Sequence, residues 1–302
     1  MQNKPNYKAH LKLHAIILTW GFTGILGKLL SIPAISIVWY RTLIASLSLA
    51  AFLIIKRRSL IIPKKLLLPY LSTGILVSLH WFFFFEALKV STVSVTLATL
   101  SSATLFTSIL EPIFFKKKII LYEIIFGIII ITGLLLIFQF ETKYHLGIIY
   151  SLISAFLASS FTTLNGIFVA KGGEPIKITM YEMIGSVTII SAYLILTNSF
   201  NTETLSLFNL GFDQFLYDSS YLLILGIIST SIAFVVSVGA MKKLTPFTVS
   251  ISVNMEPIYA IILALLFFGE KEKMSFEFYI GVAIILGTIL TNGILKKQKS
   301  KK

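Results

Sequence analysis

The stretch Pro246–Lys271, PFTVSISVNMEPIYAIILALLFFGEK, is a long apolar run that carries a polar stripe. Spacings of four, four and three residues put four polar side chains on one face of a helix; they are Thr248, Ser252, Glu256 and Tyr259. Glu256 stands directly before Pro257. A carboxylate and a proline are both costly inside a membrane unless they face a cavity or another helix. The stretch therefore predicts a transmembrane helix whose polar face lines a cavity.

The same stretch has an echo earlier in the chain, at a constant offset of 153 residues. The matched pieces are Ala87-Leu88-Lys89 with Ala240-Met241-Lys242, Thr92 with Thr245, and Phe114-Phe115 with Phe267-Phe268. The chain is therefore predicted to be one structural unit written twice.

Composition places the chain among membrane proteins. Of its 302 residues, 56% are hydrophobic and 13% are charged, whereas soluble domains carry about 25% charged residues. The net charge is +13, and the positive residues lie between apolar runs, where they orient helices rather than bind nucleic acid. The chain has no cysteine, and its four histidines are scattered, so we expect neither a metal site nor a cofactor. No cleavable signal peptide is evident.

Each crossing of the hydrocarbon needs about 20 apolar residues, and ten stretches meet this need. They are roughly 13–30, 34–55, 67–87, 91–115, 121–138, 146–169, 177–197, 219–241, 246–268 and 275–295. The predicted fold is an all-α membrane protein with two five-helix repeats, residues 13–138 and 146–295. The intervening stretch 198–218 is predicted to be a loop at the membrane interface, because it is aromatic and holds no Lys or Arg.

Loop charge predicts the orientation of the helices. The two termini and the loops after the even-numbered segments hold 20 Lys and Arg, whereas the other loops hold 4. The positive-inside rule therefore places both termini in the cytoplasm. Because each repeat has an odd number of helices, the second repeat enters the membrane inverted relative to the first. Inverted repeats are a common plan of transporters, with the substrate site at the midplane.

The sequence resembles the drug/metabolite transporter superfamily, in its EamA-type branch. The residues that carry the resemblance are Trp39-Tyr40-Arg41, Phe85-Glu86-Ala87-Leu88, Ser91, Ser94, Glu256-Pro257 and Phe267-Phe268-Gly269-Glu270. The resemblance covers nearly the whole chain and implies a ten-helix bundle with a central cavity that moves small metabolites, often outward. The chain departs from the pattern in two places: Lys116-Lys117-Lys118 replaces a leucine-glycine-glutamate ending, and Thr104 stands where the repeat offset predicts a proline.

Glu256 is the leading candidate for a functional residue. It lies about ten residues into its segment, near the bilayer centre, and intramembrane carboxylates are functional by default. It would serve as the partner of a substrate ammonium group or as a protonatable switch. The alternative is a structural hydrogen bond to a neighbouring helix.

Other charged residues inside the segments suggest two gates. Arg41 could meet Glu86 near the outer face, and Glu182, which matches Arg41 in the second repeat, could meet Lys242 or Lys243 near the inner face. Snorkelling of Arg41 to the outer interface is the competing interpretation. Glu111, beside the lysine run, is interpreted as a member of an interfacial ion pair rather than as part of a site.

Aromatic and amide side chains complete the predicted cavity. Trp20, Trp81 and Tyr259 could form aromatic walls, although aromatic residues at helical spacing also pack. His80 could relay protons or bond a backbone carbonyl. Asn165 and Asn254 are expected to mark the polar lining, because each amide must find a partner inside the membrane.

The function predicted from these features is secondary transport of small polar metabolites, such as amino acids, by alternating access, and the resemblance implies the export direction. A nucleotide-sugar or other anionic carrier of the same superfamily would need more basic residues at cavity depth than Arg41 supplies. A membrane-embedded enzyme would need a nucleophile, base or metal cluster in mutual reach. The expected surroundings are a small-molecule substrate and the lipid of the cell inner membrane; monomer and homodimer both stay open.

Overall fold

The computed structural model describes residues 7–116, 121–253 and 255–299. Every regular element in these ranges is helical. The first half consists of α1 (Tyr7–Leu29), α2 (Ala34–Ile55), α3 (Lys64–Val90), α4 (Val93–Leu100), α5 (Ala103–Phe114) and α6 (Leu121–Phe140). The second half consists of η1 (Thr142–Tyr144), α7 (His145–Ala170), α8 (Pro175–Leu196), α9 (Phe200–Thr204), α10 (Phe212–Leu223), η2 (Ile224–Ile232), α11 (Ala233–Ala240), α12 (Pro246–Val253), α13 (Glu256–Phe268), η3 (Gly269–Glu272) and α14 (Phe276–Lys299).

Three of the predicted segments are not continuous α-helices. The segment 91–115 is divided into α4 and α5 at Ser101 and Ser102, and the segment 246–268 is divided into α12 and α13 before Pro257. The segment 219–241 begins earlier, at Phe212, and contains the π-helix η2. The predicted loop 198–218 is therefore partly helical. Breaks of this kind leave backbone groups free of the regular helical ladder, which a membrane protein tolerates where they face protein or a cavity.

Six helices within the described ranges are long and apolar enough to cross a membrane. They are Ala34–Ile55, Lys64–Val90, Val93–Phe114, Thr142–Ala170, Pro175–Leu196 and Phe212–Ala240, with shorter apolar stretches at Ile125–Ile137 and Phe276–Thr288. Large apolar side chains also lie on the outer surface of the bundle, such as Leu196, Leu266 and Ile61. An apolar exterior of this kind indicates an integral membrane protein.

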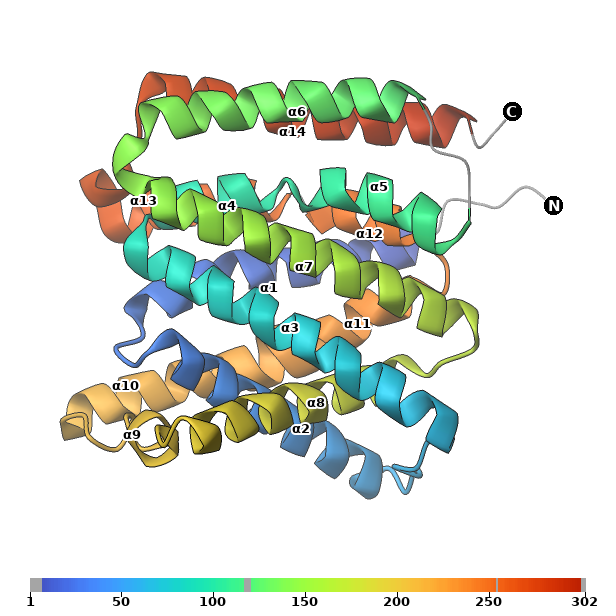
Figure 1. The fold of residues 1–302 in the computed structure, drawn as a ribbon, viewed down its shortest axis with the longest axis vertical. Helices are drawn as coiled ribbons and strands as arrows, with labels where there is room; N and C mark the ends of the chain where they lie inside the picture. The colour runs from blue at the N-terminus through green and yellow to red at the C-terminus, as the bar shows by residue number, and fades with distance from the viewer. Residues whose placement is uncertain (1–6, 117–120, 254, 300–302) are drawn as a thin grey trace.

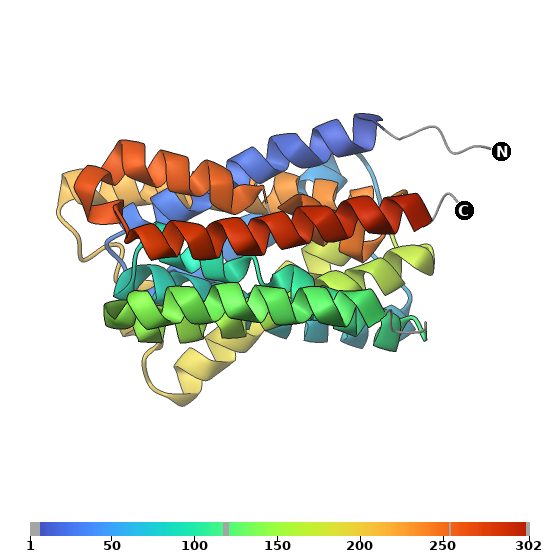
Figure 2. The ribbon, with the colours of Figure 1, turned by 90° about the horizontal axis from the view of Figure 1, so that it is seen from above.

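Corresponding helices of the two halves run in opposite directions along the bundle (Figure 1). Thus α6 runs from right to left and α14 from left to right. The two helices lie side by side on one face of the molecule, as the view from above shows (Figure 2). The start of α1 and the end of α14 lie at the same end of the bundle.

Contacts between the halves come in reciprocal pairs. Helix α3 packs against α7 and α8, and its counterpart, the α10–η2–α11 rod, packs against α1 and α2. Helix α5 packs against α7, and α13 against α1. Two helices also pack directly against their own counterparts in the other half, namely α2 against α8 and α6 against α14. Reciprocity of this kind is what a pseudo-twofold relation between two repeats produces.

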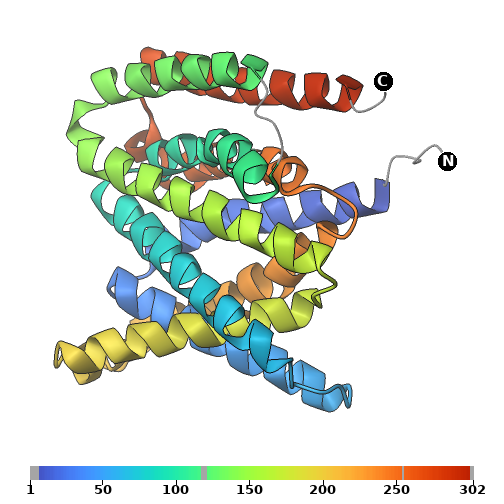
Figure 3. The ribbon, with the colours of Figure 1, turned by 45° about the vertical axis from the view of Figure 1, so that its right-hand side comes forward.

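The crossing of α3 and α8 depends on two glycines (Figure 3). A Cβ at Gly74 would collide with the carbonyl oxygen of Glu182, and a Cβ at Gly185 would collide with the backbone of Leu71. The hydroxyl of Ser186 donates to the carbonyl of Gly74 at 2.6 Å. The two backbones therefore meet without side chains between them, as small residues allow in membrane helices.

The equivalent crossing in the other half joins η2 to α2. Here a Cβ at Gly226 would collide with the side chain of Ile44 and would stand 3.3 Å from the carbonyl oxygen of Arg41. Arg41 thus occupies the place at this crossing that Glu182 occupies at the first one. The two crossings put a charged side chain of each repeat at the same structural position.

The first helical piece of two interrupted segments, α4 and α12, is capped at its start by a carboxylate from the other repeat. The Glu272 carboxylate accepts from the amides of Val93 and Ser94 at the start of α4, both at 2.9 Å. At the start of α12, the buried carboxylate of Glu111 accepts from the amide of Phe247 at 2.8 Å. A carboxylate is favourable at a helix N-terminus, where it satisfies free amides. Glu111 is therefore a helix cap, whereas Lys117 and Lys118 of the predicted ion pair lie outside the described residues.

Candidate functional site

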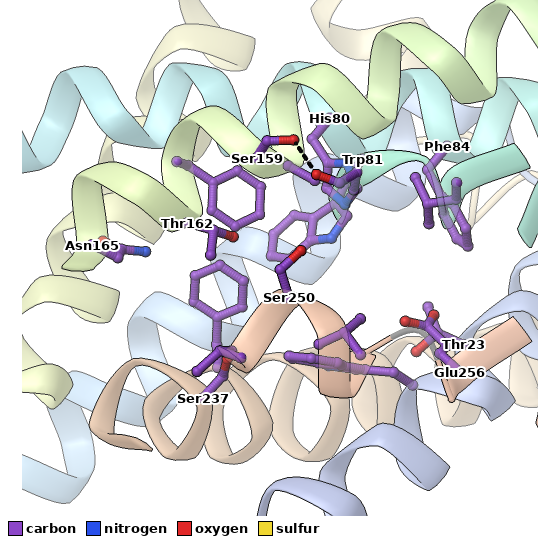
Figure 4. A pocket seen from close by; sticks show the side chains of 18 of the residues that line it. Thr23, His80, Trp81, Phe84, Ser159, Thr162, Asn165, Ser237, Ser250 and Glu256 are labelled. Carbon is purple, nitrogen blue, oxygen red and sulfur yellow. Dashed lines mark hydrogen bonds between the residues drawn. The ribbon is translucent and has the colours of Figure 1, made fainter. Parts of the chain in front are cut away.

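A cavity of about 120 Å³ lies in the middle of the bundle. Its walls come from both halves, chiefly α1, α2, α3 and α4 from the first and α7, α11, α12 and α13 from the second. Figure 4 shows His80 and Trp81 on one side of this space, with Thr23 and Glu256 on the other. The cavity is mixed in character, with aromatic rings, hydroxyl groups, the His80 imidazole and two side chains of opposite charge type, Arg41 and Glu256.

Arg41 is the cation of the cavity. Its side chain is buried, with 1% exposure, so the predicted alternative of snorkelling to the interface is wrong. Its Nε donates to the Thr230 hydroxyl at 2.5 Å, and its guanidinium carbon lies 4.0 Å from the centroid of the Trp81 ring. Its Nη1 has no hydrogen-bond partner among the described residues. The hydrogen bond to Thr230 and the stacking on the Trp81 ring thus fix the guanidinium, and its remaining N–H donors are left for a ligand.

Glu256 is the anion of the cavity. It begins α13, is 8% exposed and lies beside Pro257, which also lines the space. Arg41 is the opposite charge that acts on it, although no ion pair joins the two among the described residues. Two opposite charges in one cavity, held apart, can each bind one end of a zwitterion. The placement of Glu256 in the cavity agrees with the prediction from its position in the sequence.

The π-helix η2 orients the neighbours of these charges. Its wider turn is marked by hydroxyls that donate to the carbonyl five residues earlier, Thr230 to Leu225 at 2.7 Å and Ser231 to Gly226 at 2.9 Å. The carbonyl of Ser229 accepts from the indole of Trp20 at 2.8 Å. Single π-helical turns occur often at functional sites, and this one fixes both Arg41 and Trp20.

Aromatic rings form much of the remaining wall. Trp81 on α3 and Phe234 on α11 meet edge to face with centroids 5.8 Å apart. These two residues are themselves separated by the repeat offset of 153, so the offset would have identified Phe234 as the partner of Trp81. His80 Nδ1 lies 2.9 Å from the carbonyl and 2.8 Å from the hydroxyl of Ser154, as the structural alternative for this histidine expected.

Several lining residues were not predicted from the sequence. They are chiefly small hydroxyl and aromatic side chains, namely Thr23, Phe84, Ser101, Ser159, Phe161, Thr162, Phe234, Ser237 and Ser250. Hydroxyl residues are equally common at packed helix interfaces, so their type alone does not show which of them face a cavity.

The polar stripe of the opening stretch does not line the cavity as predicted. Val249, Ser250 and Val253 face the space beside Glu256, whereas Thr248, Ser252 and Tyr259 lie outside its lining. Helical spacing shows which residues share a face, but the inward direction depends on the neighbouring helices. The face that lines the cavity is centred about one residue further along the chain than the predicted polar face. Glu256 belongs to both faces. Asn254 lies outside the described residues.

The two predicted gate pairs are not formed. Arg41 is bonded to Thr230 in the cavity, whereas Glu86 interacts with the charge of Lys89, one turn further along α3. Lys242 lines a separate groove with Lys12, Arg58 and Glu174. Glu182 is fully buried, and within the described part of the chain it has no ion pair with a lysine. Charged residues at similar predicted depths in their helices need not lie close together in the folded bundle.

Asn165 lies where the prediction expected it, on the cavity wall (Figure 4). Its side chain is also beside the carboxylate of Glu182. It is therefore the polar residue that connects the cavity to the neighbouring helix α8.

A helical membrane bundle built from two repeats around a central cavity of mixed polar and aromatic character is the plan of a membrane transporter. The EamA-like transporter family model matches residues 8–139 and 145–293. The chain therefore belongs to the EamA-like transporter family.

Known structures agree with this assignment at the level of the fold. Among 27 matching chains, one structure titled "Crystal structure of protein" is 16% identical, with a TM-score of 0.68 over 95% of this chain and 98% of that chain. No curated protein matches the sequence.

Proposed function

We propose that this protein is a secondary transporter of small zwitterionic metabolites, with amino acids and their derivatives as the substrate class. It works by alternating access, and the export direction follows the resemblance of its sequence to exporters. The observation that carries the proposal is the pair of unlike charges in one aromatic cavity, Arg41 and Glu256. Arg41 would bind the substrate carboxylate, and Glu256 would bind the ammonium group.

The proposed membrane arrangement has ten crossings. Three of them are the broken rods α4–α5, α10–η2–α11 and α12–α13. The two repeats, 13–138 and 146–295, are inverted, and both termini lie in the cytoplasm of a cell whose inner membrane holds the protein. The support is the uneven charge of the two ends of the bundle, together with the antiparallel course of matching helices (Figure 1).

A nucleotide-sugar carrier is the closest rival. A diphosphate carries at least two negative charges and needs several cations at its site. Among the described residues that line the cavity, Arg41 is the permanent cation, and Glu256 offsets its charge. This balance favours a substrate without net charge. Membership of a transporter family argues against the enzyme alternative.

The first experiment is a thermal-stability screen of the purified protein with amino acids, primary amines, carboxylic acids and nucleotide sugars. Ligands that bind the folded state raise its melting temperature, and the stabilisation grows with the logarithm of ligand concentration over Kd. We expect stabilisation by compounds that carry both an ammonium and a carboxylate group. Stabilisation by nucleotide sugars alone would contradict the proposal.

The second experiment measures flux of the stabilising compound in proteoliposomes for wild type and Glu256→Gln. The amide cannot pair with an ammonium group, so we expect flux to fall by at least about tenfold, since charged hydrogen bonds contribute about 1.5–3 kcal/mol. Glu270→Gln is the matched control, because Glu270 is exposed and pairs with Lys273 on the surface. Wild-type flux in Glu256→Gln would show that the carboxylate is structural.

A further inference from the structure

Glu182 is a second buried carboxylate, and it is not part of the cavity lining. It lies on α8 with 0% exposure. Gly74 of α3 packs directly on its backbone carbonyl, and Asn165 of α7 lies beside its carboxylate. Three helices thus enclose a group that prefers water.

Among the described residues, no cation pairs with the carboxylate to compensate for its burial, and the polar side chain beside it is that of Asn165. Neither Oε1 nor Oε2 of Glu182 accepts a hydrogen bond of normal geometry from the described residues, and the Oδ1 of Asn165 is also unsatisfied. An ionised, unpaired carboxylate inside a protein costs several kcal/mol. A carboxylic acid, in contrast, has an O–H that can donate to an amide oxygen. One added proton would therefore satisfy two of the three unpartnered oxygens, one on each side chain.

The groups that face Glu182 give no competing explanation. Tyr70 on α3 is the titratable side chain whose charge state is linked to that of Glu182. On α8 itself, Lys177 pairs with Glu174, 3.5 Å away. Arg41 on α2 is turned to the cavity and to Thr230. Within the described part of the chain, no cation is placed to neutralise the carboxylate, so a proton is the ligand that fits.

We infer that Glu182 is the proton-binding residue that couples substrate movement to a proton gradient. This inference rests on the proposed transport function, and it assigns the coupling ion and the residue that carries it. The step is simple: the carboxylate takes a proton from water at one side of the membrane, becomes a neutral acid, and returns the proton to water at the other side.

Asn165 supplies the link between the proton and the substrate. Its side chain lines the cavity and also lies beside Glu182. An amide can turn its oxygen or its nitrogen toward a neighbour. A protonated Glu182 donates to the Asn165 oxygen, so the amide nitrogen points elsewhere. An ionised Glu182 instead accepts from the amide nitrogen. The polar surface that the substrate meets therefore depends on whether Glu182 carries a proton.

The direct test is infrared difference spectroscopy of the purified protein between acid and alkaline buffer, without substrate. We expect the wild type to show the carbonyl band of a protonated carboxyl group in an apolar site. Glu182→Gln should lack this band, and Glu182→Asp should shift it. Glu174→Gln, a change at an exposed carboxylate directly before the same helix, should leave it unchanged. Persistence of the complete wild-type band in Glu182→Gln would overturn the inference.

The functional test uses proteoliposomes and a compound that the wild type transports. In Glu182→Gln we expect accumulation driven by a pH gradient to fall to the level seen without a gradient, while exchange of labelled for unlabelled substrate continues. Accumulation at the wild-type level would overturn the inference. Two further results would also overturn the inference: loss of exchange in a Glu182→Gln protein with normal melting temperature, and failure of Glu182→Gln to fold. Either result would show that the carboxylate is needed for more than coupling to the proton gradient.

The two proposals fail in different ways. If no compound binds or moves, the transport proposal fails, yet the infrared band still shows whether Glu182 holds a proton. If a zwitterion moves with equal accumulation in wild type and Glu182→Gln, the transport proposal stands and the assignment of the coupling residue falls.

Discussion

At the residue scale, the central feature is a pair of charged side chains that occupy equivalent places in the two repeats. Arg41 lies at the crossing of α2 with η2, and Glu182 lies at the crossing of α8 with α3. One faces the cavity and keeps an unpartnered donor, whereas the other lies behind the wall and keeps unpartnered acceptors. The two repeats thus hold side chains of opposite charge at equivalent positions.

Arg41→Gln should separate the two ends of a zwitterionic substrate. The variant loses the guanidinium that would bind the carboxylate, so the affinity for an amino acid should fall by about 10- to 150-fold, since a charged hydrogen bond contributes about 1.5–3 kcal/mol. The matched primary amine, which has no carboxylate, should bind wild type and variant alike. Isothermal titration with the two compounds measures both affinities.

Two results would contradict this role of Arg41. One is an equal loss of affinity for the amino acid and the amine, which would indicate a general collapse of the cavity. The other is unchanged affinity for the amino acid. Arg41→Lys serves as the conservative variant; it keeps the charge but loses the planar fork and its stacking on Trp81, so it should restore only part of the affinity.

At the element scale, breaks and close crossings of helices shape the site. Three of the long helices are interrupted. Residues at two of the breaks, such as Ser101 and Glu256, line the cavity, and η2 bonds the side chains of Trp20 and Arg41, which line it too. Glycine crossings then bring the rods close enough to enclose it. A continuous, evenly packed bundle of ten helices would have no reason to leave such a space.

Gly74→Ala should destabilise the protein. The added methyl group would overlap with the backbone of α8, which cannot move aside as a flexible side chain can. Overpacking typically costs about 1–3 kcal/mol, and the melting temperature in detergent should fall accordingly. Gly211→Ala is the matched control, because its Cβ would meet no atom within 4 Å. An unchanged melting temperature in Gly74→Ala would show that α3 and α8 are less tightly joined than the structure indicates.

At the scale of the whole molecule, the two ends of the bundle differ in charge. The loops α2–α3, α7–α8 and α11–α12 lie at the same end as the start of α1 and the end of α14, and this end carries most of the Lys and Arg (Figure 1). The opposite end holds the loops around α9 and η3, where Glu203 accepts from the Ser36 hydroxyl and Glu272 caps the start of α4. A membrane protein with such a difference orients its basic end toward the cytoplasm.

Cysteine labelling tests this orientation. Single cysteines at Lys56 and Lys171 should react with a membrane-impermeant maleimide only after the membrane is opened, whereas cysteines at Asp213 and Glu270 should react in intact cells. All four positions are exposed, and the native chain has no cysteine. Labelling of Lys171 and Asp213 positions from the same side would contradict the inverted arrangement.

Much of this architecture could be predicted from the sequence alone. Apolar segment length, loop charge and the 153-residue echo are properties of short stretches, and they predicted an all-helical membrane protein made of two repeats. The position of Glu256 at cavity depth was predictable for the same reason, because an intramembrane carboxylate must face the interior. The helix break at Ser101 was not predicted, since the weak preferences of single residues yield to packing, whereas Pro257 disturbs a helix by itself because it has no amide hydrogen to donate.

Only the tertiary structure decided which charges share a space. Helical spacing suggested Arg41 with Glu86 and Glu182 with Lys242, yet the bundle joins Arg41 to the cavity of Glu256 and leaves Glu182 with Asn165. It also turned Thr248, Ser252 and Tyr259 away from the space that Glu256 faces. The physical reason is that periodicity fixes the angle between residues on one helix, whereas the rotation of that helix depends on contacts with residues far away in the chain. Examples are the contact of Gly74 in α3 with α8 and the contact of Gly226 in η2 with α2.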